Sequence, residues 1–316
     1  MHNDLVASLE ILRAKRGFDV KKYIDDKCTV LNRYLSEAKL KSCLIAVSGG
    51  IDSAITLGLV TRASKQPDSP IRKIVAALIP VFSKEGATNQ DEALARGKEV
   101  SLAFGVEPIV VDLTVGHTLM KDTVDKSMGV VGQPWAKGQL VAYMRTPALY
   151  YITSLLTEQH MSGILCGTTN RDEGAYLGYV GKASDGMVDV QLISDLHKSE
   201  VYQVARALGV PQSSRDAVPT GDMYDGRTDE QVFGAPYDFV ELYLLYISMN
   251  DEVKKKEIDD KWCEAATNQF NELKERIEAL HSYNKHKYIA KSPAVHLDIL
   301  ESNVPGGWTN VSPYQN

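Results

Sequence analysis

Four short apolar runs in the first half of the chain limit its possible folds more than any other feature. They are CLIAV (43–47), IVAALIP (74–80), PIVVDL (108–113) and GILCG (163–167). Apolar and polar residues do not alternate in them, which is typical of strands that are buried on both faces of a sheet. Helical patterns lie between the runs. The sequence therefore predicts an α/β fold, in which a doubly wound parallel sheet has helices on both faces.

Parallel strands need crossover connections between them, and the helical patterns lie where such connections are expected. We expect helices at about 20–39, 53–64, 86–103 and 138–160, and two more near 237–248 and 260–281. In such sheets ligands bind beyond the carboxyl ends of the strands, so the loops that follow the four runs should carry the functional site.

Composition excludes some classes of partner. The chain has 35 basic and 41 acidic residues and a net charge of -6, which argues against a nucleic-acid or anionic-membrane surface. Its four cysteines (Cys28, Cys43, Cys166 and Cys263) match no zinc or redox spacing, so we expect a reduced, cytoplasmic protein. The first residues mix charges into every turn, unlike a signal peptide, and no apolar stretch approaches the length of a membrane span.

The segment SGGIDS directly follows the first apolar run. Gly49 and Gly50 let the backbone turn sharply and approach a bulky ligand, and the helix that begins near Asp52 points free N–H groups into the same space. Ser48 and Ser53 add hydroxyl donors. The loop therefore suits phosphate oxygens, although it lacks the lysine of a Walker loop and the third glycine of a dinucleotide fingerprint. The alternative is a strand-to-helix turn that binds nothing.

SGGIDS resembles the pyrophosphate loop of the N-type ATP pyrophosphatases, which include NAD, GMP and asparagine synthetases and tRNA-thiolating enzymes. Within that group, GTTNRDEGAYLGYVGKASDGMVDVQLISDLHKSEVYQVARALGVP (167–211) is similar to the NAD synthetase pattern. VPTGDMYDGRTDEQVFGAPYD (218–238) and the pair His286-Lys287 also resemble segments of that family. The resemblance runs from about residue 20 to about residue 290.

This resemblance implies an ammonia-dependent NAD synthetase, with ATP as co-substrate and Mg²⁺ as cofactor. Such enzymes transfer AMP to a carboxylate oxygen of nicotinate adenine dinucleotide, release pyrophosphate, and let ammonia displace the AMP. The carboxylate has to be activated because its oxygen is a poor leaving group. Lysines and Mg²⁺ would stabilise the charge that gathers on the phosphates.

The resemblance also implies roles for individual residues. The ATP phosphates would be held by Ser48, Gly49, Gly50, Ile51, Asp52, Ser53, Ala54 and Ile55, with more ATP contacts from Thr168, Lys198 and Thr220. The metal ligands would be Asp52 and Glu173. The acceptor dinucleotide would be bound by Tyr34, Arg145, Lys182, Asp189, His286 and Lys287. Asp185 would lie near the reacting centre and complete a catalytic set with Asp52, Glu173 and Lys198.

Four positions depart from the family pattern: Gln139, Tyr143, Gly181 and Gln191. They cluster where the acceptor would bind, whereas the ATP and metal positions are intact. The same chemistry on nicotinate mononucleotide or another pyridine carboxylate therefore stays open, and so does a nucleotide-binding sensor without turnover. Considered singly, Lys182 and Lys198 could also be ordinary surface lysines.

The resemblance further suggests a homodimer. Glutamine-dependent relatives carry a nitrilase-like domain ahead of the synthetase, and because only about forty residues precede the first strand here, we expect free ammonia as the donor. The alternative is a separate glutaminase partner that supplies the ammonia. We divide the chain into an N-terminal helical segment (1–40), a synthetase-like domain (41–290) and a C-terminal tail (291–316).

Overall fold

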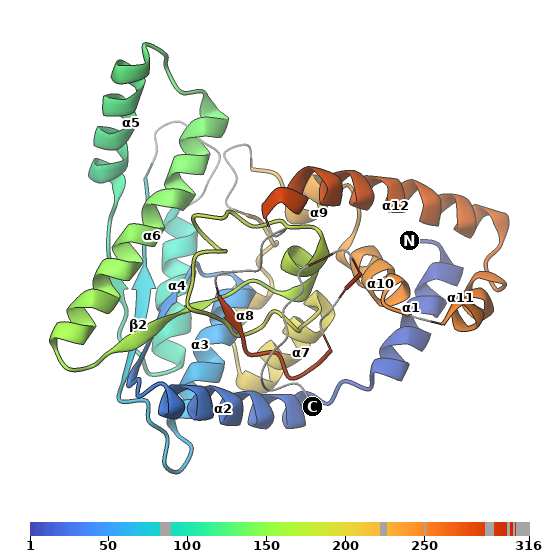
Figure 1. Ribbon diagram of the computed structural model, residues 1–316, viewed down its shortest axis with the longest axis horizontal. Coiled ribbons are helices and arrows are strands. Elements are labelled where there is room, and N and C mark those ends of the chain that lie inside the picture. Colours follow the sequence, from blue (N-terminus) through green and yellow to red (C-terminus); the bar gives the residue numbers. More distant parts are fainter. Residues whose placement is uncertain are drawn as a thin grey trace.

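A parallel sheet forms the centre of the molecule (Figure 1). The computed structural model describes residues 1–82, 90–221, 226–249, 251–287, 294–301, 304–305 and 307. The strands are β1 (Ser42–Ala46), β2 (Lys73–Leu78), β3 (Ile109–Val110), β4 (Gly163–Gly167), β5 (Val190–Gln191) and β6 (Val295–His296). All neighbours are parallel, in the order β3-β2-β1-β4-β5-β6. The four predicted strands are confirmed, but the predicted burial is wrong for β3, a two-residue edge strand whose side chains are exposed. β5 and β6 lie outside the four apolar runs.

Helices cover both faces of this sheet, which confirms the predicted fold class. One face packs on α2 (Val20–Glu37), α3 (Ile51–Ser64), α4 (Gln90–Ala103) and α7 (Lys198–Leu208). The other face packs on α6 (Pro134–Glu158), whose side chains Leu149 and Leu156 join those of Leu44 and Leu165. Successive side chains of β1 point to opposite cores, so the strand needs apolar residues at nearly every position.

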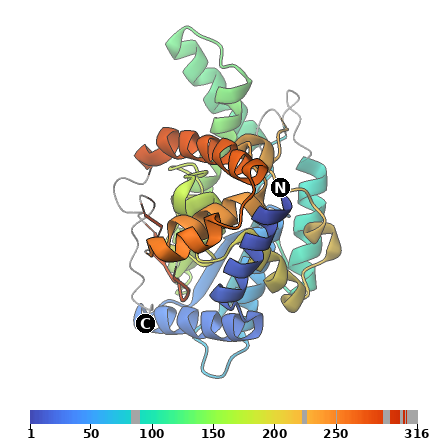
Figure 2. The ribbon, with the colours of Figure 1, turned by 90° about the vertical axis from the view of Figure 1, so that its right-hand side faces the viewer.

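A second helical layer lies beside the sheet (Figures 1 and 2). It consists of α1 (Asn3–Arg16), α10 (Tyr237–Ile247), α11 (Glu252–Asp259) and α12 (Glu264–Asn284), which enclose an apolar core of their own. Leu5 and Leu9 of α1 meet Phe239 of α10 and Ile277 of α12 in this core. The layer holds α10 against the turn that follows β4, and thereby closes one side of the functional region described below.

Short elements connect these layers. They are α8 (Gln212–Arg215), α9 (Asp229–Phe233), the π-helical turn η1 (Asp172–Tyr176) and the 3₁₀ turn η2 (Lys285–Lys287). The segment that we assigned to a C-terminal tail supplies β6 and the buried side chain of Leu297, so its described part belongs to the sheet and its core.

Helix α5 (Thr114–Met128) pairs with α6 in a hairpin that extends beyond the rest of the molecule in both views (Figures 1 and 2). It exposes many large apolar side chains: Val115, Leu119, Met120, Val124, Met128, Val130, Val131, Trp135, Tyr151 and Leu155. We call this set the hairpin apolar face. Within the described ranges, no helix is both long and apolar enough to cross a membrane.

The cysteines are all free thiols. Cys28, Cys43 and Cys166 are buried, as expected for small core residues. Cys263 is exposed, and its Sγ lies 3.6 Å from Nε2 of His2, while its backbone N–H donates to the carboxylate of Asp4 at 3.0 Å. Cysteine spacing did not predict this contact, because His2 and Cys263 are far apart in the sequence.

Candidate active site

The strand order creates a switch point between β1 and β4. From β1 the chain proceeds through β2 to β3 on one side of the sheet, whereas from β4 it proceeds through β5 to β6 on the other. The loops that leave β1 and β4 therefore diverge, and a crevice forms at their carboxyl ends. The loop after β1 is SGGIDS, and the loop after β4 begins GTTN.

Close packing on α4 requires a glycine at position 49 in the loop SGGIDS. Gly49 has φ +83°, and a Cβ atom there would overlap the carbonyl oxygen of Ala93 and lie 3.0 Å from Cβ of Arg96. Arg96 Nε also donates a hydrogen bond to the carbonyl oxygen of Gly49 at 3.3 Å. The residue must therefore be glycine for both conformational and steric reasons.

The second half of the loop opens helix α3. Gly50 is its N-cap and makes no side-chain capping bond, so backbone N–H groups of the first turn remain available. Ser53 Oγ accepts a hydrogen bond from the backbone N–H of Ser48 at 3.2 Å and donates to the carbonyl oxygen of Gly50 at 3.0 Å. These bonds hold the loop in a curved shape with the free N–H groups at its mouth. Ile51, Ala54 and Ile55 are buried and contribute to this loop through their backbone and packing.

Three of the four predicted catalytic side chains meet in front of this loop. Nζ of Lys198 lies 2.6 Å from Oδ2 of Asp52 and 3.2 Å from Oε1 of Glu173. Nδ2 of Asn170 bonds to the same two carboxylates, at 3.0 Å and 2.6 Å. Asp52 comes from the first turn of α3, Glu173 from η1 and Lys198 from the first turn of α7. We call Asp52, Glu173 and Lys198 the central cluster.

Two further residues extend the cluster. The hydroxyl of Tyr237 lies 2.9 Å from Oε1 of Glu173 and 2.8 Å from Oδ2 of Asp229. A phenol carries one proton, so it donates to one of these carboxyl groups at a time. Nζ of Lys198 also lies 5.0 Å from the ring centroid of Tyr237, within cation–π range.

Burial and charge strongly perturb these groups. Burial raises the pKa of Glu173 to about 8; Lys198 opposes this and Asp52 adds to it. Burial likewise raises the pKa of Asp229. For Lys198, burial lowers the pKa, but Asp52 and Glu173 outweigh it and the net shift is upward. One ammonium thus faces three carboxyl groups in a poorly solvated place, and the surplus carboxylate oxygens are the ligand type that Mg²⁺ prefers.

A pocket of about 310 Å³ opens beside Lys198, a size within the range of small-molecule sites. It is lined by Lys198, Ser199, Tyr202, Val218, Pro219, Thr228, Glu230, Tyr237 and Asp238. Thr220 follows this lining at an exposed position, and Thr168 is half-buried at the end of β4. Both predicted ATP contacts therefore lie in loops around the central cluster.

The expected acceptor residues fall into two groups. The first surrounds the loop 181–187. Lys182 and Asp185 are exposed on it, and the Asp185 carboxylate accepts hydrogen bonds within the loop, including one from the backbone N–H of Gly181 at 3.2 Å. Lys287 reaches this region and donates to the carbonyl oxygen of Gly178 at 3.0 Å, and burial lowers its pKa against the effect of Asp185. His286, next to it, is exposed.

The second group lies beside strands of the sheet. Asp189 accepts a hydrogen bond from the backbone N–H of Leu165 in β4 at 2.7 Å. Tyr34 is half-buried, and its pKa is raised by burial and by Asp189. Arg145 donates from Nε to the carbonyl oxygen of Ile79, just after β2, at 3.2 Å.

The four departures from the family pattern gather around the loop 181–187. The hydroxyl of Tyr143 donates to Oε1 of Gln139 at 3.0 Å, and the Tyr143 ring lies beside Gly181. Nε2 of Gln191 donates to the carbonyl oxygen of Asp185 at 2.8 Å. The altered positions are therefore spatial neighbours, although they span about fifty residues of sequence.

Sequence reasoning gave no role to Asn170 and Tyr237, which bond to the central cluster, or to Asp229, which bonds to Tyr237. Each lies in a segment already quoted for the family resemblance: GTTN for the first and the TDEQVFGAPYD stretch for the other two. The sequence segments that carry these residues were therefore recognised, but only the fold shows that the three side chains lie together near Glu173.

Comparison with known proteins agrees with this geometry. Residues 23–290 match the family model described as NAD synthase. The curated NH(3)-dependent NAD(+) synthetase of Thermoplasma volcanium is 30% identical over 237 residues, which cover 75% of this chain and 88% of that protein. The enzyme of the same name from Pyrococcus furiosus is 28% identical over 263 residues, covering 82% of this chain and 90% of that protein.

Solved structures show the same fold. The NMN synthetase of Francisella tularensis aligns with a TM-score of 0.65 and 24% identity, over 85% of this chain and 96% of that chain. The NAD+ synthetase of Burkholderia pseudomallei aligns with a TM-score of 0.60 and 21% identity, over 81% and 92%. With the family model matching most of its length and relatives at this level of identity, the chain belongs to the NAD synthase family.

Proposed function

We propose that this protein is an ammonia-dependent NAD synthetase. The observation that carries the proposal is the central cluster: Lys198 bridges Asp52 and Glu173 directly in front of a glycine loop at the switch point of the sheet. The names of the curated relatives support the same activity.

The first step joins two anions. A carboxylate oxygen of the acceptor attacks the α-phosphorus of ATP, and the bond to the oxygen that leads to the β-phosphorus breaks, so that pyrophosphate leaves. The N–H groups at the start of α3 donate to phosphate oxygens, and the Lys198 ammonium balances charge that grows as pyrophosphate departs. A bound Mg²⁺, held by Asp52 and Glu173, would supply further charge compensation.

The second step forms the amide. The lone pair of ammonia attacks the carbonyl carbon of the adenylate, AMP leaves with the electron pair of the broken C–O bond, and the new nitrogen loses a proton. The chain binds both reactants and holds them together, which supplies much of the rate. We assign Asp185, on the loop 181–187, to this reacting centre, and assign acceptor binding to Tyr34, Arg145, Lys182, Asp189, His286 and Lys287.

We also propose that two copies of the chain form a homodimer through the hairpin apolar face. The support is the gathering of large exposed apolar side chains on a hairpin that projects from the body of the protein, since such patches mark association surfaces. A cytoplasmic location is proposed on the free thiols, three of which are buried and unpaired.

The test is direct product analysis. The purified protein is incubated with ATP, Mg²⁺, ammonium and nicotinate adenine dinucleotide, and AMP and NAD are measured by chromatography. Equal amounts of AMP and NAD are expected. Nicotinate mononucleotide is run in parallel, because one solved neighbour is described as an NMN synthetase. Amide formed only from the mononucleotide would reassign the acceptor, and ATP binding without AMP would contradict enzymatic activity.

A further inference from the structure

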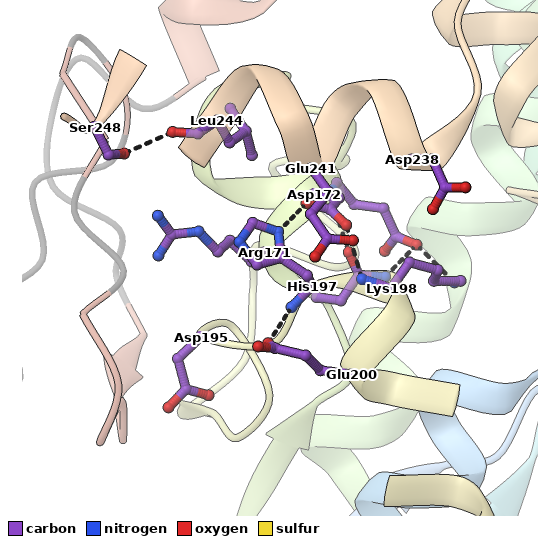
Figure 3. A network of polar contacts seen from close by, with 12 residues as sticks. Arg171, Asp172, Asp195, His197, Lys198, Glu200, Asp238, Glu241, Leu244 and Ser248 are labelled. Atoms are coloured by element: carbon purple, nitrogen blue, oxygen red, sulfur yellow. Dashed lines mark hydrogen bonds and ion pairs between the residues drawn. The ribbon is translucent and has the colours of Figure 1, made fainter. Parts of the chain in front are cut away.

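A buried carboxylate lies immediately beside the central cluster without contacting its carboxylates. Asp172 precedes Glu173 in η1, and its side chain is fully buried. Its Oδ1 lies 2.6 Å from Nδ1 of His197, and its Oδ2 accepts a hydrogen bond from the backbone N–H of Lys198 at 2.7 Å (Figure 3). One carboxylate therefore holds two consecutive residues at the start of α7.

The imidazole of His197 shares one hydrogen bond with this carboxyl group, through Nδ1. Burial, assisted by Arg16 and Arg171, lowers the pKa of His197 to about 3, so the ring is neutral at physiological pH. Burial also raises the pKa of Asp172 to about 7, so either group can carry the proton of the 2.6 Å contact between Nδ1 and Oδ1. Within the described residues, the buried Nε2 has no hydrogen-bond partner. The Nδ1 contact is therefore the bond that joins the ring to the turn η1.

Other bonds fix the same two segments to each other. The backbone N–H of Arg171 donates to the carbonyl oxygen of Leu196 at 2.8 Å, so the residues before Glu173 run alongside those before Lys198. The backbone N–H of His197 donates to Oε2 of Glu200 at 2.9 Å, which caps α7. Glu200 is itself held by Arg16. The first turn of α7 is therefore held on two sides.

We propose that Asp172 is a positioning residue for Lys198. By bridging His197 and the Lys198 backbone, it sets α7 at the height and orientation at which the Lys198 ammonium lies between Asp52 and Glu173. The physical need is clear: a lysine side chain has four rotatable carbon–carbon bonds and is poorly fixed by its own geometry. A fixed backbone attachment point limits the positions that its ammonium can reach. The inference rests on the proposed function, in which Lys198 contacts ATP.

The competing explanation is that Asp172 only stabilises the fold, as buried polar pairs can do. The two explanations differ in whether the effect of an Asp172 substitution on ATP affinity depends on the presence of Lys198. If Asp172 acts through the lysine, its effect on ATP should vanish when the lysine is absent. If it only stabilises the protein, the effects should simply add.

The experiment is a double-mutant cycle with Asp172→Asn and Lys198→Gln. Asparagine keeps the shape of the side chain but loses its charge. Affinity for ATP in the presence of Mg²⁺ is measured by calorimetry, AMP formation by chromatography, and folding by thermal unfolding. In the wild-type background we expect Asp172→Asn to reduce AMP formation by about 10–100-fold, since small misplacements in active sites have effects of this size, and to weaken ATP binding several-fold. In the Lys198→Gln background it should change ATP affinity by less than about two-fold.

A matched control uses another buried carboxylate. Glu241 is 1% exposed and accepts two hydrogen bonds from Arg13, at 3.0 Å and 2.6 Å. Glu241→Gln removes the same charge but no hydrogen bond to His197 or to the Lys198 backbone, because the recorded bonds of Glu241 go to Arg13, so it should lower the thermal midpoint while leaving ATP affinity and the AMP rate near wild type.

A second pair of variants covers the case in which Asp172→Asn does not fold. His197→Asn retains a side-chain N–H donor near the Nδ1 position and should preserve most ATP affinity, whereas His197→Leu should lose it. Equal factors for Asp172→Asn in both lysine backgrounds, or wild-type ATP affinity in His197→Leu, would overturn the proposal. The calorimetric arm reports on Lys198 even if no amide product forms, so failure of the proposed function and failure of this inference are distinguishable.

Discussion

Replacing Gly49 by alanine tests the two reasons why the phosphate loop has a glycine at this position: its backbone conformation and its close packing on α4. At φ +83° an alanine is in the left-handed region, which raises the energy by about 1–2 kcal/mol for any residue with a Cβ. Its Cβ would also overlap the carbonyl oxygen of Ala93 and lie 3.1 Å from the backbone nitrogen of Gly97. Both are backbone atoms of α4, which cannot move aside as a flexible side chain would.

The magnitude follows from adding the two effects. Overpacking against a rigid neighbour typically costs about 1–3 kcal/mol, and the reduced freedom of the unfolded chain returns about 0.4–1 kcal/mol. Gly49→Ala should therefore destabilise the protein by about 1–5 kcal/mol, or displace the loop from α4. Domains of 150–250 residues lose about 2–4 °C in Tm for each kcal/mol, so a drop of a few degrees or more is expected.

Two other glycines provide controls. Gly105 has φ +74° with no atom within 4 Å of an added Cβ, so Gly105→Ala carries the conformational effect alone, about 1 kcal/mol. Gly50 has φ −84°, and an added Cβ would meet nothing closer than Ser48 Oγ at 3.4 Å, so Gly50→Ala should be the most stable of the three. Its Cβ would instead stand at the mouth of the loop and weaken ATP binding.

Urea unfolding and calorimetry with ATP and Mg²⁺ test this order. We expect stability to fall in the order Gly50→Ala, Gly105→Ala, Gly49→Ala, and ATP affinity to fall for Gly49→Ala and Gly50→Ala but not for Gly105→Ala. A Gly49→Ala protein that unfolds and binds ATP like the wild type would refute the close packing of the loop on α4.

Three further predictions concern the cluster and the hairpin. Lys198→Met should reduce AMP formation by about 10²–10³-fold, because it removes charge compensation from the reacting phosphates; an AMP rate within a few-fold of wild type would exclude Lys198 from the site. Burial raises the pKa of Glu173 from 4.5 to about 8 in the metal-free protein, so the folded state keeps a proton that the unfolded chain has released. Stability should then fall as pH rises from about 4.5 to 8, and Glu173→Gln should flatten this slope in urea titrations; an unchanged slope would contradict the shift. Leu119→Asp, on the hairpin apolar face, should convert a dimer to monomers in sedimentation, whereas Leu102→Asp, at an exposed leucine of α4 outside that face, should not.

Much of the fold followed from local patterns. A strand buried on both faces needs apolar residues at successive positions, so β1, β2 and β4 are visible as uninterrupted runs. β5 and β6 are two residues long and owe their place to pairing with Cys166 and Val190 rather than to any pattern of their own. Helix α5 was also missed, because its apolar side chains are exposed and give no clear buried stripe.

In the candidate site, too, one part could be predicted from local sequence and another could not. The phosphate loop could be recognised because its chemistry lies in six consecutive residues, and local sequence controls the turn. The central cluster could only be expected by resemblance: Asp52 and Lys198 are 146 positions apart, and their 2.6 Å contact depends on where α3 and α7 end in space. The resemblance likewise grouped Tyr34 and Asp189 with the acceptor residues, and in the structure the charge of Asp189 helps to raise the pKa of Tyr34.

By itself, then, the sequence determined the buried strands β1, β2 and β4 and the loop that can cradle an anion, since these depend on residues that are neighbours in the chain. The tertiary structure alone decided which distant side chains share a space. The strand order brings the ends of β1 and β4 together. As a result, the Lys198 ammonium lies between the carboxyl groups of Asp52 and Glu173, and Asp172 accepts a hydrogen bond from the Lys198 backbone N–H. Such contacts arise from packing and crossover geometry over the whole domain, which no local pattern encodes.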